Sequence, residues 1–170
     1  MNYEKSAVAR PWQRKFLGIS FTAHKESRIR VPEETQKRGR SKLKALFRRG
    51  RGRNLGRFIR EDLNPVLNGW ANYFRISETK GFAEVLDSWI RRRLRSIIWR
   101  QWKRPWTRFR NLMKIGLSEE RAATSAFNQR GSWWNSGASH MNQAFPKKYF
   151  DNLGLISVLE KVICFRIAST

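Results

Sequence analysis

The sequence has almost none of the residues that form disulfides or hold metal ions. Cys164 is its only cysteine, so an internal disulfide and a cysteine-rich zinc site are both excluded. The two histidines, His24 and His140, lie far apart in the sequence, which argues against a structural metal site. We therefore expect neither a metal ion nor a cofactor.

Long apolar segments are also missing. No apolar run approaches the roughly 20 residues that a helix needs to cross a bilayer. Residues 1–15 lack the apolar centre of a secretory signal peptide. The sequence therefore predicts an intracellular, cytoplasmic protein with no membrane partner.

Acidic residues are scarce relative to basic ones. The 170 residues include 36 Lys and Arg but only 13 Asp and Glu, which gives a net charge of +23. Such a charge destabilises a compact chain by self-repulsion, so a polyanionic partner is expected. Nucleic acid is the leading class of partner and an anionic membrane surface the second. The hydrophobic content of 40% is enough for a core in one or two small domains.

The strongest local pattern lies between Phe82 and Trp102. Apolar residues recur there every three or four positions, which predicts one long helix with a buried face. Basic residues fill the rest of its surface: Arg91, Arg92, Arg93, Arg95, Arg100, Lys103 and Arg104. A solvated face laced with salt bridges would need interleaved acids, yet none occurs between Asp87 and Glu119. This helix is therefore predicted to meet an external polyanion.

The N-terminal part predicts a β-hairpin followed by a helix. Residues 16–21 and 29–31 are β-prone, and residues 24–27 supply the turn. A helix is predicted over residues 33–49, because Pro32 precedes it and two glutamates lie in its first turn. The Gly/Arg-rich residues 48–54 are predicted to form a flexible loop whose arginines contact phosphates, with a disordered linker as the alternative.

The next stretch predicts two consecutive helices. Asn54 is a candidate N-cap, and Pro65 should end or restart the helix near Asn64. Trp70, Tyr73 and Phe74 share one face with Leu67 and are expected in the core. Gly69 is expected to let a neighbouring helix approach closely. The pair Glu61–Asp62 is interpreted as a solvated or arginine-paired surface.

Beyond Pro105 the sequence predicts a second, smaller helical module. Short helices are expected over residues 108–115, after Ser118, and over residues 145–153 and 155–166. Residues 130–142 are predicted to be a loop. Adjacent side chains point in opposite directions, so one of Trp133 and Trp134 is expected to be anchored and the other exposed. An exposed one could stack on a base, and a simple plug in the loop is the alternative.

Three motifs in this order resemble one known family. They are N-P-x-L-x-G-W-x-N-Y-F at residues 64–74, S-W-I-R-R-R-L-R at 88–95 and W-K-R-P-W-T-R-F-R-N-L at 102–112. Together they resemble the maturase-specific domain, also called domain X or thumb, of group II intron reverse transcriptase/maturases. The resemblance extends from about residue 15 to residue 159. It implies that the hairpin is the edge of a palm domain and that residues 106–170 correspond to a small basic DNA-binding segment.

The catalytic groups of such a polymerase are absent from this chain. The resemblance implies a parent RNA-directed DNA polymerase, whose metal-binding aspartates usually lie in a Y-x-D-D turn. The aspartates here are Asp62, Asp87 and Asp151, and none lies in such a turn. Two histidines and one cysteine also cannot form an H-N-H endonuclease motif. We therefore predict no catalytic residues.

The predicted fold is mainly α. A short N-terminal β-hairpin is followed by a thumb-like three-helix bundle and a small C-terminal helical segment. The predicted division is residues 1–31 for the lead and hairpin, 32–105 for the maturase-specific domain, and 106–170 for the basic segment.

The predicted function is an RNA-binding maturase module that binds group II intron RNA and assists its splicing, without a polymerase site of its own. One alternative is a truncated or split reverse transcriptase subunit. It would act as a thumb on a template–primer duplex, with palm and fingers on a separate polypeptide. Another is an inactive remnant. A DNA target is a further candidate partner.

The candidate site residues are basic or polar side chains outside the predicted apolar faces. Those predicted to bind RNA are Lys42, Arg48, Arg49, Arg51, Arg53, Asn72, Arg75, Arg91, Arg92, Arg95, Arg100, Lys103 and Arg104. Those predicted to contact DNA are Arg108, Arg110, Arg130 and Trp134.

Overall fold

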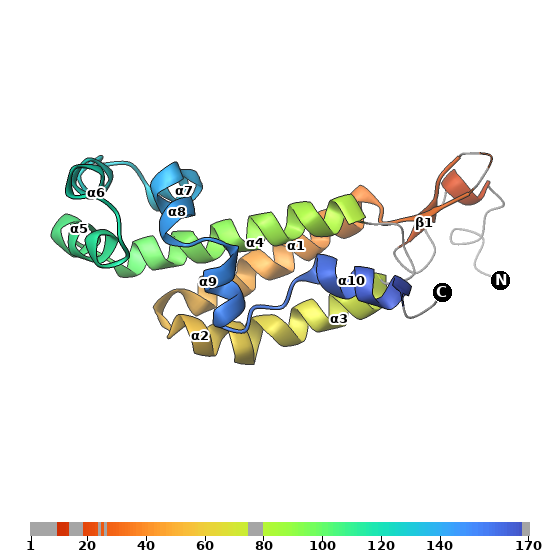
Figure 1. The fold of residues 1–170 in the computed structure, drawn as a ribbon. Helices are drawn as coiled ribbons and strands as arrows, with labels where there is room; N and C mark the ends of the chain where they lie inside the picture. The colour runs from red at the N-terminus through yellow and green to blue at the C-terminus, as the bar shows by residue number, and fades with distance from the viewer. Residues whose placement is uncertain (1–9, 14–18, 24, 26, 75–79, 168–170) are drawn as a thin grey trace.

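The computed structural model describes residues 10–13, 19–23, 25, 27–74 and 80–167. The chain is mostly helical with a short antiparallel hairpin near its N-terminus, which confirms the predicted fold class. Figure 1 shows an elongated molecule with the hairpin at one end and helices α5 and α6 at the other. Helices α1 and α4 run side by side between these ends.

The predicted hairpin is present, with two short strands among the described residues. Strand β1 (Ser20–Phe21) pairs with β2 (Ile29–Arg30), with Phe21 opposite Ile29. A short 3₁₀ helix, η1 (Pro11–Gln13), precedes it. Predicted strand residues 16–18 and turn residues 24 and 26 lie outside the described residues.

Helix α1 (Glu33–Arg49) has the predicted bounds. The segment after it differs from the prediction, because Gly50–Gly52 form a 3₁₀ turn, η2, instead of a flexible loop. The Gln101 side chain donates hydrogen bonds to the carbonyls of Arg51 (3.2 Å) and Arg53 (2.9 Å). The flexible-loop prediction is therefore wrong, because an amide on a distant helix fixes the backbone of this turn.

The middle of the chain is one continuous helical path. It comprises α2 (Leu55–Arg57), the π-helical turn η3 (Phe58–Leu63) and α3 (Asn64–Phe74). The Asn54 side chain accepts a hydrogen bond from the Arg57 backbone N–H at 3.1 Å, so its predicted capping role is confirmed. Pro65 has no N–H to donate to an earlier carbonyl, which explains why the hydrogen-bond pattern changes at Asn64.

Helix α4 (Lys80–Gln101) is the longest of the described helices and contributes more buried apolar side chains than any other of them. The second half continues with α5 (Pro105–Lys114), α6 (Glu119–Ala126), α7 (Ser132–Gly137), α8 (Ser139–Ala144), α9 (Lys147–Asn152) and α10 (Val158–Ile167). The loop predicted over residues 130–142 is therefore wrong. Its helices are organised by Asn135, a fully buried side chain whose amide donates to the carbonyls of Arg130 (2.9 Å) and Gly131 (3.1 Å).

The C-terminal helices pack on the same core as the central ones. Helix α7 lies against α4, and α10 lies against both α3 and α4. The buried apolar cluster runs from Leu43 in α1 to Val162 in α10. The Asn64 amide bridges the two halves, because it donates to the Gly154 carbonyl (2.8 Å) and accepts from the Ile156 N–H (3.2 Å).

Close contact between α1 and α3 occurs at Gly39. A Cβ atom built at Gly39 would lie 2.0 Å from the far end of the Trp70 indole, whereas a Cβ at Gly69 would meet nothing within 4 Å. The predicted role of Gly69 in close approach is therefore wrong, and Gly39 has that role instead. Phe74 is buried and Trp70 partly buried, but Tyr73 is 48% exposed and does not join the core as predicted.

This contact makes a matched pair of substitutions informative. Gly39→Ala should lower the free energy of unfolding by about 1–3 kcal/mol, because the new methyl group displaces the Trp70 ring. Gly69→Ala should raise it by about 0.5–1 kcal/mol, because alanine favours a helix and has free space there. Urea denaturation of both variants measures the two changes. Equal effects in the two variants would show that Gly39 does not determine this packing.

Candidate nucleic-acid interface

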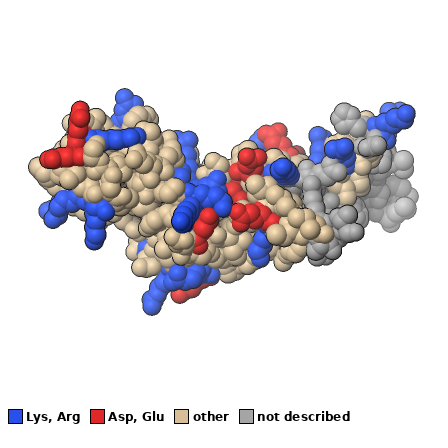
Figure 2. Space-filling view, viewed as in Figure 1, with Lys and Arg blue, Asp and Glu red and all other residues tan. Residues whose placement is uncertain are grey.

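Charge is unevenly arranged on the molecule. On the face shown in Figure 2, carboxylates gather near the middle among lysines and arginines, so this face carries both signs. Some of these opposite charges form ion pairs, as Lys147 does with Asp151 (3.0 Å) and with Glu160 (2.8 Å). This face therefore does not by itself mark a site for a polyanion, and the positions of individual basic side chains must be compared.

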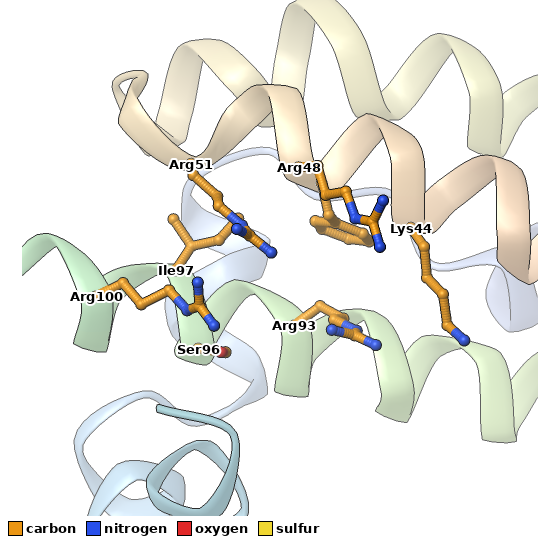
Figure 3. A pocket seen from close by; sticks show the side chains of 8 residues that line it. Lys44, Arg48, Arg51, Arg93, Ser96, Ile97 and Arg100 are labelled. Atoms are coloured by element: carbon orange, nitrogen blue, oxygen red, sulfur yellow. The ribbon is translucent and has the colours of Figure 1, made fainter. Parts of the chain in front are cut away.

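A cation-rich surface lines a cleft between two walls. Helix α1 and the turn η2 form one wall, and helix α4 forms the other. The cleft has a volume of about 240 Å³. Five cationic side chains line it, together with Ser96 and the apolar Phe47 and Ile97: Lys44, Arg48, Arg51, Arg93 and Arg100. Figure 3 shows the cationic groups converging on the space between the two helices. We call this site the α1–α4 cleft.

No carboxylate neutralises this cleft within the part of the chain that the structure describes. None of its five cations forms an ion pair with a described acidic residue. Burial lowers the pKa of Arg93, and neighbouring guanidinium groups lower it further: those of Arg51, Arg100, Arg92 and Arg48. These groups are therefore close enough to repel one another, and an anion in the cleft would relieve that repulsion.

Helix α7 positions the α4 arginines that face it. The Arg92 and Arg93 guanidinium groups lie over the Trp133 ring, at 4.1 and 4.4 Å from its centroid. Arg92 also donates to the Trp133 carbonyl (3.2 Å), and Arg100 donates to the Ser132 hydroxyl (2.8 Å). Trp133 is thus a platform for arginines, although it remains 38% exposed.

Three of the predicted contact residues have partners within the molecule. Arg53 pairs with Glu61 (3.0 Å) and with Asp62, which confirms the arginine-paired interpretation of these two acids. Arg95 is only 9% exposed and donates to the Phe145 carbonyl at 2.9 Å.

Burial lowers the pKa of Arg95 to about 10, with a smaller contribution from Arg91, so Arg95 stays charged at neutral pH. Arg108 lies over the Trp99 ring (4.8 Å) and donates to the Trp102 carbonyl (2.9 Å). Arg95 and Arg108 therefore join helices, and we leave them out of the proposed interface.

The other predicted residues are distributed over several elements. Arg91 is half-buried beside Asp87 and Asp151 at a small cavity. Arg130 lies over the Trp134 ring (4.3 Å), and Trp134 is 46% exposed, so neither tryptophan is fully buried. Arg75 lies outside the described residues. The remaining ones are exposed outside the cleft: Lys42, Arg49, Asn72, Lys103, Arg104 and Arg110.

Two cleft residues, Lys44 and Arg93, were absent from the predicted contact set. Helical spacing in the sequence could have indicated that both residues share a face with predicted contact residues. Lys44 lies one turn before Arg48, and Arg93 lies two turns before Arg100 on the same face of α4.

Metal-binding clusters and membrane-spanning helices are both absent from the described residues. Within the described residues, no three His, Cys, Asp or Glu side chains are grouped in a way that could hold a metal ion. No helix in the described part of the chain has the length and apolar character needed to cross a membrane.

Comparison with known proteins identifies the central part of the chain. No curated protein matches the sequence significantly. Residues 36–116 match the family described as group II intron, maturase-specific domain. The match begins inside α1 and ends just after α5, so it includes both walls of the α1–α4 cleft. The resemblance seen in the sequence motifs is therefore confirmed for residues 36–116, which match the maturase-specific domain of group II introns.

Proposed function

We propose that this chain binds group II intron RNA through the α1–α4 cleft and the exposed basic residues around it, and that binding assists splicing. The observation that carries the proposal is the convergence of five cations without a described acidic partner inside a matched maturase-specific domain. The arginine guanidinium group can bind two phosphate oxygens at once, and phosphate contacts supply a large share of a protein's affinity for nucleic acid.

The proposed mechanism leaves splicing chemistry with the RNA. A protein that binds the folded form of an RNA more tightly than unfolded forms shifts the population toward the folded form. The protein groups needed for this role are phosphate ligands held in a fixed arrangement. Helices α1 and α4 hold the cleft cations from opposite sides, and Gln101 fixes the backbone that presents Arg51.

The experiment is a comparison of two RNAs of equal length, a structured group II intron and an unrelated transcript, over a series of salt concentrations. If all five cleft cations contact phosphates, they contribute about four to five units to the slope of log affinity against log salt. The account predicts a preference for the intron that persists as salt rises, because shape recognition adds to charge. Equal affinities that vanish together with salt would reduce the chain to a general polyanion binder and overturn the proposal.

Contact with DNA remains a secondary proposal for the C-terminal helices. The exposed pair of Arg130 and Trp134 combines a cation with an aromatic ring, which suits a nucleotide phosphate and base. A single-stranded DNA oligonucleotide that quenches Trp134 fluorescence, with loss of that quenching in Trp134→Phe, would support it. Unchanged fluorescence at saturating DNA would refute it.

A further inference from the structure

The α1–α4 cleft concentrates more positive charge than a single phosphate can neutralise. Five cationic groups face a volume of about 240 Å³, whereas one phosphodiester carries a single negative charge. Burial lowers the pKa of Arg93, and the neighbouring guanidinium groups of the cleft lower it further, as expected for cations that repel one another. The charge balance therefore favours several phosphates held close together.

The lining also suits a compact anion in its geometry. Phe47 and Ile97 provide apolar walls, which strengthen electrostatic attraction by excluding water. The Arg93 Nε atom is buried and has no hydrogen-bond partner among the described residues. A buried donor of this kind is costly unless a ligand or water satisfies it.

The two α4 arginines of the cleft, Arg93 and Arg100, are held in place before any ligand arrives. Arg93 rests on Trp133 (4.4 Å) and near Trp89 (5.0 Å), and Arg100 donates to Ser132. Held side chains lose less conformational entropy on binding than free ones, so a ligand that matches their spacing gains affinity.

We propose that the α1–α4 cleft is a site for a cluster of closely spaced phosphates, as occurs where a folded RNA backbone turns sharply or two backbone segments meet. This inference rests on the proposed RNA-binding function and adds the class of RNA feature recognised. The cleft thereby favours compact RNA over the same RNA unfolded, while exposed cations outside it bind both forms alike.

The first test uses inorganic tripolyphosphate as a compact anion, independent of any RNA. Arg48→Gln/Arg51→Gln removes two cleft cations, and Arg57→Gln/Lys148→Gln removes two exposed cations elsewhere. Titration calorimetry should show one tripolyphosphate site in the original protein. The cleft variant should lose about a hundredfold in affinity, since each charge-assisted hydrogen bond is worth about tenfold. The matched variant should stay within about twofold.

The second test compares magnesium-folded and magnesium-free intron RNA at equal ionic strength. The original protein and the matched variant should prefer the folded form, and Arg48→Gln/Arg51→Gln should lose that preference. Thermal melting followed by circular dichroism verifies that all three proteins are folded.

The two tests distinguish failure of the phosphate-cluster site from failure of the proposed binding of intron RNA. Equal losses of tripolyphosphate affinity in the two variants would overturn the phosphate-cluster site while leaving intron binding intact. Failure of the original protein to distinguish intron from unrelated RNA would overturn the proposed function. The tripolyphosphate result would still decide whether the cleft holds clustered phosphates.

Discussion

Asp87→Ala should lower the free energy of unfolding by about 3 kcal/mol or more, because it removes the acceptor of three hydrogen bonds at once. Asp87 is 5% exposed and lies in α4. Its carboxylate accepts from the Ser157 hydroxyl (2.6 Å) and from the backbone N–H groups of Val158 (3.1 Å) and Leu159 (3.2 Å). These donors lie at the start of α10, where a negative charge also favours the helix dipole.

Urea denaturation measures this loss, and two variants control it. Glu84 is exposed on the same helix, so Glu84→Ala should change the unfolding free energy by no more than about 0.5 kcal/mol. Asp87→Asn keeps an acceptor oxygen but loses the charge, so its effect should be intermediate. A loss below about 1 kcal/mol in Asp87→Ala would show that the carboxylate does not anchor α10.

Arg95→Ala should lower the free energy of unfolding by about 2–4 kcal/mol while leaving RNA affinity unchanged within about twofold. The reason is that Arg95 donates to the Phe145 carbonyl inside the molecule and does not line the α1–α4 cleft. Arg48→Ala removes the same charge from an exposed cleft residue. It should barely change stability and should weaken RNA binding about tenfold.

The free energy of unfolding and the RNA affinity are measured for Arg95→Ala and for Arg48→Ala. Together they test whether Arg95 stabilises the fold and Arg48 binds RNA. Arg95→Met adds a third case, because an apolar side chain of similar length often replaces a buried charge at small cost. Its stability loss should be smaller than that of Arg95→Ala. If Arg95→Ala and Arg48→Ala weaken RNA binding equally at conditions where both are folded, the division would be wrong.

The long helices could be predicted from the sequence because their apolar periodicity is strong. Helix α1 has the predicted bounds, and α4 begins two residues before the predicted Phe82 and ends one residue before the predicted Trp102. The short helices α7 and α8 could not be predicted in the same way. Each spans only six residues, and the buried Asn135 amide orders this part of the chain through contacts that periodicity does not reveal.

The basic character of α4 could be predicted, but not which arginine faces the cleft. Arg93, Arg95 and Arg100 all belong to the same charged stripe, yet Arg95 alone of these three is buried. That difference depends on where the Phe145 carbonyl lies, 50 residues further along the chain. The support that Trp133 gives to Arg92 and Arg93 is likewise a tertiary contact.

The packing roles of Gly39 and Gly69 also depend on tertiary contacts that the sequence does not reveal. Gly39 lies inside a helix, where sequence rules predict only a loss of helix stability. Its packing role appears only when the Trp70 ring is placed against it. The sequence favours Gly69 for this role because it adjoins Trp70, but adjacent helix positions face different directions.

The most direct measurement of the central claim is the magnesium concentration at which a group II intron RNA folds, followed by chemical probing with and without the protein. A protein that binds the folded RNA preferentially must lower that midpoint. The account predicts a lower midpoint with the original protein and a smaller shift with Arg48→Gln/Arg51→Gln. An unchanged midpoint while the RNA is saturated with protein would contradict the account, because binding would then not favour the folded intron.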